Sequence, residues 1–532
     1  MFSESAWSRK SIGDVDVIFH EGLYHLFHLV LPNHDFVAHA ISENALNWRR
    51  VDNALFIGHP GSWDDLMLWT VHVSQDPHRV GSWRMFYTGL SRRDQGLKQR
   101  IGMAISDDLF TWRKTPVNWE DRRGATDPEL VKEARQKLPR GISDSIQSVL
   151  NPSSCFPLEP DPEYYESSVD AERNWVSFRD PFYFRDGDEG WLLAAARVNS
   201  GPLVRRGCVA AMKEVKPHEF AAQPPLLAPQ IYDDIEVPNL FRIDGEYYLI
   251  GSLREDAKIR YWHTNEIGRP WRNYYDNVLL PKGNYAGRVC QDENGVLLWN
   301  FFTDLVGDRT SNNIMPPPKR LRSCPDGQLR ATTFEGLAKR VKQRIDCSRL
   351  SPLKTQSDQG GLHTTGDSMR LTSEAGFQAY VFQPQLDCFS LSALMDMQGV
   401  GKCGLVVRID PESHDGYYIS LDLMKGIAQM RAWGTGPLHS GEEMMQFQSL
   451  QAGYWYAERP RDIEIGLLAF GSYHELSVNG RVVLSLVDAT FSRGLVGFYV
   501  ETADLHVKNL SLESLEPPTQ ADDHLVQGTL PT

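Results

Sequence analysis

A turn glycine followed by a β-rich, largely aromatic run occurs five times in the first part of the chain. The five runs are residues 22–28, 81–89, 190–197, 245–251 and 295–301. Successive glycines are separated by 59, 109, 55 and 50 residues, so one interval is much longer than the other three. Repetition at a fixed period is the signature of architectures built from stacked or radial units. The pattern predicts five four-stranded units arranged as a β-propeller, whose sheet edges are short and protected.

A second strand type supports the repeat. Residues 37–42 and 101–106 each end in a serine that precedes a tryptophan by six positions, as Ser42 precedes Trp48 and Ser106 precedes Trp112. The long interval is interpreted as one unit plus an insertion at about 120–170, which is polar and acidic and contains a helical pattern at 127–137. A β-sandwich of similar size is the structural alternative for this domain.

The character of the chain changes at about residue 360, where short alternating strands recur roughly every ten residues, a spacing typical of a β-sandwich. One of their turns is Asn479-Gly480, a strong hairpin signal. We therefore predict an all-β chain, a five-bladed β-propeller followed by a C-terminal β-sandwich. The predicted boundaries are 1–314 for the propeller, 315–359 for a linker, 360–515 for the sandwich and 516–532 for a disordered tail.

Charge and cysteine usage exclude several partner classes. The formal net charge of −14 disfavours nucleic acid and anionic membranes, which select Lys- and Arg-rich surfaces. The seven cysteines form no CxxC pair, so neither a disulfide framework nor a zinc site is expected. Residues 1–10 hold no apolar stretch that could serve as a signal sequence, and no run of 18 apolar residues exists. The sequence thus predicts a cytoplasmic protein; its oligomeric state is left open.

Acidic residues recur at the same phase of three units, just before the strand that faces the propeller axis. They are Asp14 with Asp16 in the first unit, Asp180 after Arg179 in the third, and Glu236 before Val-Pro in the fourth. Each acid alone also fits a turn, a cap or a structural ion pair. Their shared phase instead favours convergence at one site, and hydrolysis of a glycosidic bond needs two carboxylates that flank it.

At these motifs the chain resembles glycoside hydrolase family 32, the β-fructosidases, and more loosely family 43. Residues 179–181 match the Arg-Asp-Pro motif of family 32, and residues 236–238 resemble its Glu-Cys-Pro motif. Residues 13–14, ahead of the 22–28 run, resemble its nucleophile strand, and 285–287 and 315–321 resemble later elements. The resemblance covers most of residues 12–340 and implies a glycosidase, with the β-fructofuranosyl group as the cleaved unit.

The sequence departs from the family around the sugar ring. Residues 12–16 lack the usual Trp-x-Asn-Asp-Pro-Asn-Gly, Phe-Ser-Gly-Ser is replaced by residues 68–72, and Val237 replaces the family's cysteine. These changes affect the expected substrate more than the expected fold. Asp14 and Asp16 both remain candidates for the nucleophile. Asp14 is favoured because it lies ten residues before Tyr24, as the catalytic aspartate does in related propellers.

The resemblance implies a retaining mechanism with three catalytic carboxylates. Asp14 would attack the anomeric carbon, Glu236 would act as acid and then base, and Asp180 would hold ring hydroxyls beside Arg179. Trp69 is a candidate sugar platform, which blade packing would equally explain. His72 and Asp16 are further substrate-binding candidates, although a single histidine is more often structural. No metal and no cofactor are expected, and the partner is an oligosaccharide or small glycoside.

Three alternatives remain open. An inverting arabinofuranosidase or xylosidase similar to family 43 would use the same acids, with carboxylates roughly 6.5–9.5 Å apart instead of roughly 5 Å. A glycoside phosphorylase would need a basic pocket, for which Arg205, Arg206 and Arg288 are the candidates. A sugar-binding protein without catalysis would keep the fold, but the presence of all three acids speaks against it.

Overall fold

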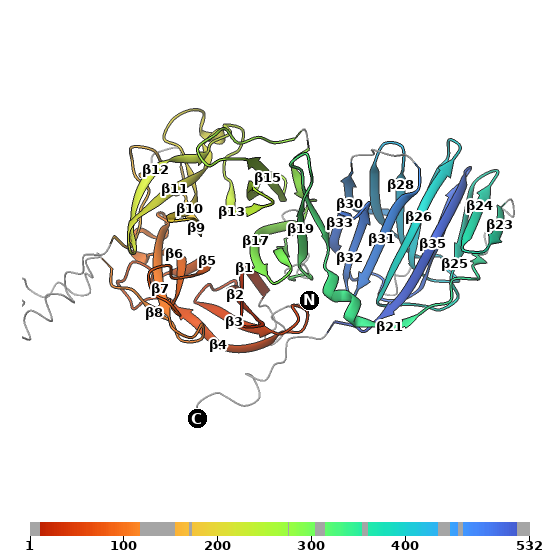
Figure 1. Cartoon of the computed structure of the whole chain (residues 1–532), viewed down its shortest axis with the longest axis horizontal. Coiled ribbons are helices and arrows are strands. Elements are labelled where there is room, and N and C mark those ends of the chain that lie inside the picture. The colour runs from red at the N-terminus through yellow and green to blue at the C-terminus, as the bar shows by residue number, and fades with distance from the viewer. Residues whose placement is uncertain are drawn as a thin grey trace, which may run out of the picture.

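The computed structural model describes residues 11–117, 155–169, 173–274, 276–303, 314–353, 360–434, 447–455 and 461–518. The chain forms five four-stranded sheets and two larger ones. Figure 1 shows the small sheets arranged as a ring, with the larger sheets beside it as a second domain. The predicted all-β class, a propeller followed by a sandwich, is therefore confirmed. The helix expected at 127–137 lies outside the described residues.

Each blade is a four-stranded antiparallel sheet built from strands consecutive in the chain. The first two blades are β1 (Ser11–His20), β2 (Leu23–Leu31), β3 (Phe36–Ser42) and β4 (Arg49–Phe56), then β5 (Met67–Gln75), β6 (Trp83–Leu90), β7 (Arg100–Ser106) and β8 (Arg113–Lys114). The next two are β9 (Phe178–Asp186), β10 (Glu189–Arg197), β11 (Gly207–Lys216) and β12 (Glu219–Leu227), then β13 (Glu236–Ile243), β14 (Glu246–Leu253), β15 (Lys258–Thr264) and β16 (Val278–Leu280). The fifth is β17 (Asn284–Asp292), β18 (Gly295–Phe302), β19 (Lys319–Ser323) and β20 (Leu329–Thr333).

The innermost strands β1, β5, β9, β13 and β17 surround the propeller axis, and each contacts the next around the ring (Figure 1). The expected turn glycine follows the innermost strand in four blades, with a φ of 79° at Gly22, 75° at Gly81, 92° at Gly245 and 121° at Gly295. The third blade differs, because its turn glycine is Gly187, with a φ of 56°. Gly190 instead lies within β10, where an added Cβ would come within 2.4 Å of the Tyr183 hydroxyl. That glycine is required by close packing rather than by a turn.

The predicted boundary between propeller and linker is wrong. Residues 319–323 and 329–333 form β19 and β20, the two outer strands of the fifth blade, so the propeller continues past residue 314. Most of the predicted linker 315–359 therefore belongs to a domain. A single 3₁₀ segment, Glu335–Arg340, connects the blade to β21 (Val341–Arg344), which already pairs with the last strand of the sandwich.

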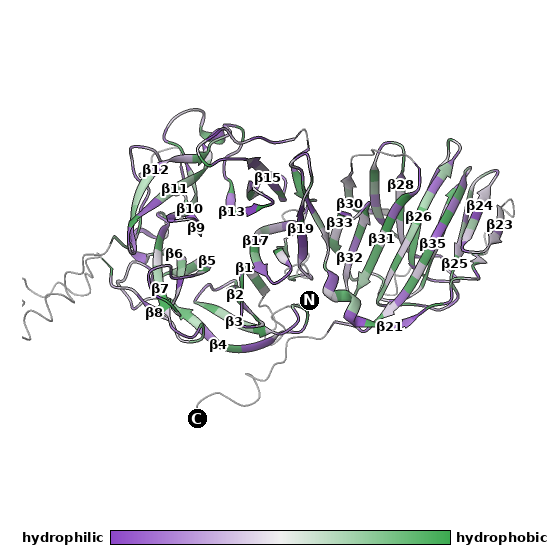
Figure 2. Ribbon diagram, in the orientation of Figure 1, coloured by the Kyte–Doolittle hydropathy of each residue, from purple (hydrophilic) through white to green (hydrophobic). Residues whose placement is uncertain are grey.

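The sandwich consists of an eight-stranded and a seven-stranded sheet. The eight-stranded sheet contains β21, β23 (Gly360–Thr365), β24 (Ser368–Ser373), β26 (Phe389–Gln398), β31 (Ile463–Phe470), β32 (Tyr473–Val478), β33 (Arg481–Val487) and β35 (Asp504–Leu515). The seven-stranded sheet contains β22 (Ser351–Pro352), β25 (Phe377–Val381), β27 (Lys402–Ile409), β28 (Gly416–Asp422), β29 (Ile427–Trp433), β30 (Phe447–Tyr454) and β34 (Leu495–Glu501). Figure 2 shows hydrophobic and hydrophilic residues alternating along these strands, and the apolar faces of both sheets form one core.

The ring closes through side chains, because the first and fifth blades share no strand. The Tyr24 hydroxyl donates to Asp292 at 2.9 Å, and the rings of Trp48 and Trp299 lie 5.6 Å apart. The fifth blade also carries the sandwich, since Asn284 Nδ2 donates to the carbonyl of Ser485 at 2.8 Å. One hydrophobic cluster continues across this domain interface. The two domains are therefore joined by a packed, hydrogen-bonded contact.

The remaining segments are only partly described. Of the insertion predicted at about 120–170, residues 155–169 pack on the second and third blades, where Phe156 and Tyr165 are buried. Of the predicted tail 516–532, residues 516–518 are described, and the Arg340 guanidinium donates to the carbonyl of Pro517 at 2.6 Å. Within the described part of the chain, no helix has the length and apolar character needed to cross a membrane.

Candidate active site

All five innermost strands carry a β-bulge at the same level of the propeller. The extra residue lies at 13–14 in β1, at 70 in β5, at 180–181 in β9, at 237–238 in β13 and at 286–287 in β17. A bulge breaks the alternation of side chains and redirects a residue that would otherwise face a neighbouring strand. Five bulges at one level therefore direct side chains from all five blades toward the axis.

A cavity of about 190 Å³ opens at this level. Its polar and aromatic wall consists of Asp14, His34, Trp69, Thr70, Arg179, Asp180, Glu236 and Tyr285, and its apolar wall includes Leu29, Leu31 and Phe301. The three predicted catalytic acids thus converge in one cavity. Their catalytic roles stay predictions.

Asp14 lies in the bulge of β1 and accepts a hydrogen bond from the Thr70 hydroxyl of β5. Burial, together with the nearby charges of Asp180 and Glu236, raises the pKa of Asp14 to about 7. Because the carboxyls interact, the proton belongs to the cluster rather than to one side chain. The cavity therefore retains a proton near neutral pH, as acid-assisted bond cleavage requires.

Glu236 lies just before the bulge of β13, and its side chain is 15 % exposed. Its Oε1 accepts a hydrogen bond from the Arg179 guanidinium at 2.5 Å, and its Oε2 accepts one from the Tyr285 hydroxyl. Burial and the charge of Glu236 raise the pKa of Tyr285 well above its ordinary value, so that hydroxyl remains a donor. Two donors from neighbouring blades thus fix the orientation of the carboxylate.

Asp180 occupies the left-handed region, with a φ of 61°, and the residue after Glu236, Val237, has a φ of 50°. Such values are rare for residues other than glycine, and for a β-branched side chain they are strained. Asp180 Oδ2 accepts the Val237 amide at 3.0 Å, while the Asp180 amide donates to Thr88 Oγ1 at 3.0 Å. The unusual backbone is therefore held by contacts between blades, and it places the two acids at adjacent positions on the wall.

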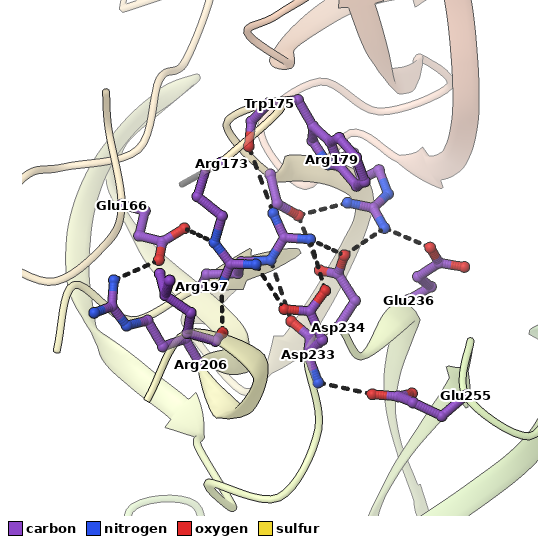
Figure 3. A network of polar contacts seen from close by, with 12 residues as sticks. Glu166, Arg173, Trp175, Arg179, Arg197, Arg206, Asp233, Asp234, Glu236 and Glu255 are labelled. Atoms are coloured by element: carbon purple, nitrogen blue, oxygen red, sulfur yellow. Dashed lines mark hydrogen bonds and ion pairs between the residues drawn. The ribbon is translucent and has the colours of Figure 1, made fainter. Parts of the chain in front are cut away.

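Arg179 is anchored from behind by a buried aspartate (Figure 3). Asp234 Oδ2 lies 3.2 Å from Arg179 Nη2 and 2.7 Å from Arg197 Nη2. Asp234 Oδ1 accepts the Ser177 hydroxyl at 3.0 Å. Asp234 and Arg197 are each 1 % exposed, so both charges depend on these partners.

The alternation of charges continues away from the cavity, as Figure 3 shows. Arg197 contacts Asp233 at 3.2 Å, and Asp233 contacts Arg173 at 2.8 Å. Arg173 then lies 3.3 Å from Glu166, which pairs with Arg206 at 2.8 Å. A network of opposite charges thus connects residue 166, in the described end of the insertion, to the guanidinium that contacts Glu236.

Arg288, immediately after the bulge of β17, links all five innermost strands. Its guanidinium donates to the carbonyls of Val71, Pro181 and Pro238 at 3.3, 2.8 and 3.2 Å, and Nε lies 3.6 Å from Asp16 Oδ1. These partners lie on β5, β9, β13 and β1. Arg288 is fully buried and does not line the cavity. Arg288 therefore joins the five blades. The prediction that it could bind phosphate in a phosphorylase is wrong.

The other predicted binding residues divide into two groups. Trp69 and Arg179 line the cavity, whereas Asp16 and His72 do not. Asp16 accepts the Val73 amide at 2.7 Å and lies 3.1 Å from His72 Nδ1, so the pair joins β1 to β5. This arrangement corrects the prediction that the two residues bind substrate, and it favours Asp14 over Asp16 as the nucleophile.

The two arginines at 205 and 206 also lie away from the cavity. Arg206 pairs with Glu166, and Arg205 is exposed. The basic pocket expected of a phosphorylase is therefore not formed by these candidates. Among the described residues, the only arginine in the cavity wall is Arg179, whose guanidinium is already paired with Glu236 and Asp234.

Three residues that bring polar groups to the cavity wall were not predicted to bind substrate, namely Thr70, Tyr285 and His34. Thr70 is the bulge residue of β5, and Tyr285 directly precedes the bulge of β17, as Glu236 precedes that of β13, so both share the phase of the repeat that identified the acids. Applying that phase to all five units would have found both. His34 follows β2, and burial lowers its pKa, so its imidazole is neutral near pH 7. No repeat position marks it in the sequence.

Within the described ranges, no group of three or more His, Cys, Asp or Glu side chains is arranged to hold a metal ion. The expectation that the chemistry needs no metal and no cofactor stays a prediction.

No protein-family model matches the sequence, and no curated protein matches it. Solved structures do match in fold. A complex of fructan 1-exohydrolase IIa from Cichorium intybus with 1-kestose has a TM-score of 0.65 at 13 % identity, covering 96 % of this chain and 96 % of that chain. Sucrose-6-phosphate hydrolase from Lactobacillus gasseri has a TM-score of 0.63 at 15 % identity, covering 96 % and 91 %. A family 32 β-fructofuranosidase from Bombyx mori has a TM-score of 0.60 at 15 % identity, covering 95 % and 92 %. The predicted resemblance to glycoside hydrolase family 32 is therefore confirmed at the level of the fold, over nearly the whole chain.

Proposed function

We propose that the protein is a glycoside hydrolase that releases terminal β-fructofuranosyl residues from oligosaccharides or small glycosides. The observation that carries the proposal is the convergence of Asp14, Asp180 and Glu236 in one cavity of a propeller-and-sandwich fold. That fold is shared with structures named as β-fructofuranosidase, fructan exohydrolase and sucrose-6-phosphate hydrolase. Fold alone does not determine function, so the proposal depends on the carboxylates.

The size of the cavity favours cleavage at a chain end. Sites that bury a drug-sized ligand span about 300–1,000 Å³, whereas this cavity measures about 190 Å³. A space of that size suits one terminal sugar unit. Trp69 in its wall offers an aromatic face against which the C–H face of a sugar ring can pack.

The proposed reaction is a double displacement. An Asp14 oxygen attacks the anomeric carbon while the bond to the leaving oxygen breaks, and Glu236 transfers its proton to that oxygen. Glu236 then removes a proton from water, and the hydroxide displaces Asp14 to free the sugar and restore both carboxyls. Asp180 accepts hydrogen bonds from ring hydroxyls, and Arg179 and Tyr285 orient Glu236 between the two steps.

The test is sugar release from sucrose, inulin, levan, arabinan oligosaccharides and xylo-oligosaccharides by the wild type and by Glu236→Gln. We expect fructose release that the substitution lowers by about 10²–10⁴-fold, the usual contribution of a general acid–base group. Glu266→Gln is the matched control, because that glutamate is 61 % exposed and pairs with Arg269 outside the cavity.

Other outcomes would redirect the proposal. Pentose release that depends on Glu236 would favour the arabinofuranosidase or xylosidase alternative. NMR observation of the first-formed anomer separates retention from inversion. Binding without release of any sugar, equal in both variants, would contradict catalysis and favour a sugar-binding protein.

A further inference from the structure

The wall of the propeller cavity has a polar side and an apolar side. Asp180 and Glu236, on the third and fourth blades, belong to the polar side. Leu29 and Leu31 of the first blade and Phe301 of the fifth form the apolar side. Each innermost strand contacts the next around the ring, so the junction between the first and fifth blades lies opposite the third blade (Figure 1). The apolar side therefore faces Asp180 across the cavity.

The apolar side is built closely against the strand that carries Asp14. Gly13 lies in the bulge of β1, and a Cβ there would come within 3.0 Å of Leu29 Cβ and 3.1 Å of Leu31 Cδ2. Both leucines thus pack on the backbone directly before Asp14. Phe301 lies on β18, which also contacts β1, and its ring is 6 % exposed. Burial is the largest cause of the raised pKa of Asp14, which agrees with a poorly hydrated wall at this point.

The polar groups nearest to this side are engaged elsewhere. The Tyr285 hydroxyl donates to Glu236. His34 follows β2, but it lies toward the second blade, with its ring 6.2 Å from that of Trp69. Asp14 keeps its remaining oxygen for the anomeric carbon in the proposed reaction. Within the described part of the chain, the side chains of the apolar side offer a sugar hydroxyl no donor and no acceptor of their own.

A furanosyl ring has two chemically different edges. In a fructofuranosyl unit, the vicinal hydroxyls on C3 and C4 occupy one edge. The ring oxygen occupies the opposite edge, flanked by the hydroxymethyl groups on C2 and C5. Because Asp180 is proposed to accept the vicinal hydroxyls, the opposite edge faces Leu29 and Leu31. A hydroxymethyl oxygen placed there would exchange its hydrogen bonds to water for an apolar surface, a cost that a methyl group or a hydrogen atom avoids.

We propose that Leu29 and Leu31 determine the specificity of the cavity. The preferred terminal unit is a furanosyl group that has vicinal ring hydroxyls but lacks at least one hydroxymethyl oxygen of fructose. A deoxyketofuranosyl unit meets this description. A pentofuranosyl unit also does, since it carries hydrogen in place of the hydroxymethyl group at the anomeric carbon. This inference rests on the proposed function, in which Asp180 holds the ring hydroxyls. Fructosides are then cleaved, but more slowly than their deoxy counterparts.

The test compares methyl β-fructofuranoside with its monodeoxy analogues and with the methyl arabinofuranoside of the same ring configuration. Sugar release followed by NMR gives kcat/KM for each compound. We expect kcat/KM to rise about 10–100-fold when the hydroxyl on C1 or C6 is removed, since a hydrophobic surface rejects an added hydroxyl by about 10²-fold. Removal of the hydroxyl on C3 or C4 should instead lower kcat/KM by up to about 10⁴-fold, because Asp180 loses its partner.

Leu29→Asn places a hydrogen-bond donor and acceptor on the apolar side with little change in volume. It should reduce the preference for the deoxy analogue about tenfold, mainly by raising kcat/KM for the fructoside. Leu31→Asn makes the same change at a partly exposed position, which keeps the test decisive if the substitution at the buried Leu29 prevents folding. Leu97→Asn is the matched control, because Leu97 is 39 % exposed and lies outside the cavity. It should leave the preference unchanged.

Calorimetric binding of the same glycosides to Glu236→Gln separates this inference from the proposed function. The expected order of affinities without cleavage by the wild type would contradict a glycosidase but support the specificity. The highest kcat/KM and affinity for the complete fructoside would overturn the specificity while leaving the glycosidase intact. A preference that both Leu29→Asn and Leu31→Asn leave unchanged would also overturn it. Neither binding nor cleavage of any of these glycosides would contradict both proposals.

Discussion

Arg179 directly precedes one predicted catalytic acid in the chain, yet its guanidinium hydrogen-bonds another, Glu236, at 2.5 Å on the neighbouring innermost strand. The same guanidinium is held from behind by Asp234. The residue that orients Glu236 is therefore itself oriented by a buried acid that does not line the cavity.

Asp234→Asn should reduce both stability and turnover. Removing one partner of a buried ion pair costs about 3–5 kcal/mol of unfolding free energy. With Arg179 less firmly held, we expect kcat to fall more than KM rises, and the pH profile of kcat/KM to shift. Asp233→Asn is the matched control, since its side chain is 35 % exposed and lies one step farther from Glu236. Equal effects of the two substitutions on the pH profile would contradict a positioning role for Asp234.

Stability should fall as the pH rises through the range in which the carboxyl cluster around Asp14 loses its proton. The pKa of Asp14 is raised from its ordinary value of 3.8 to about 7, so the folded protein binds an extra proton between these values. The free energy of unfolding should therefore decrease from about pH 4 to about pH 7, by at most about 1.4 kcal/mol per pH unit, and level off above. Denaturant titrations of the wild type and Asp14→Asn at a series of pH values measure this. A difference between the two curves that grows in the opposite direction would show that Asp14 is not the group responsible.

Trp69 and His72 should behave differently although they lie three residues apart on β5. Trp69 lines the cavity, so Trp69→Ala should raise KM for a short substrate by about tenfold through loss of one aromatic contact. His72 contacts Asp16 and the carbonyl of Tyr183, so His72→Ala should lower the melting temperature and leave KM unchanged. Steady-state kinetics and thermal unfolding of both variants decide. A raised KM for His72→Ala with an unchanged melting temperature would show instead that His72 binds substrate.

Arg288→Met should destabilise the propeller. The methionine fills much of the volume but removes the donors that join the carbonyls of Val71, Pro181 and Pro238 and leaves Asp16 without its guanidinium. We expect a loss of about 3–5 kcal/mol, measured by denaturant unfolding. Arg242→Met, at an exposed arginine of the fourth blade, should change stability little. Similar losses in the two variants would show that the five-strand contact is not stabilising.

The propeller and the sandwich could both be predicted from the sequence. The spacing of the turn glycines and the alternating strands after residue 360 reflect turns and strands, which depend mainly on neighbouring residues. The linker prediction failed at 315–359, where two short strands that complete the fifth blade follow a proline run and carry little aromatic signal. Gly190 was also assigned the wrong role, since a glycine needed for close packing looks the same in a sequence as one needed for a turn.

The repeat predicted which residues lie at the level of the site, but it did not predict which way their side chains point. Asp14 and Asp16 stand two apart, which on a regular strand would put both on one face. The bulge at 13–14 breaks that alternation, so Asp14 reaches the cavity while Asp16 turns toward β5 and His72. No local residue pattern marks these bulges, since they arise from the fit of each innermost strand to its neighbour and around a closed ring.

The placement of the bulges has a consequence for how such a protein can diversify. Each bulge belongs to one hairpin and leaves the register of the other four blades unchanged. The bulges are nevertheless coupled in pairs, because Thr70 of β5 donates to Asp14 of β1 and the Val237 amide of β13 donates to Asp180 of β9. A substitution at one bulge is therefore felt by the blade beside it, so a change in the shape of the cavity requires compatible residues at two bulges rather than at one.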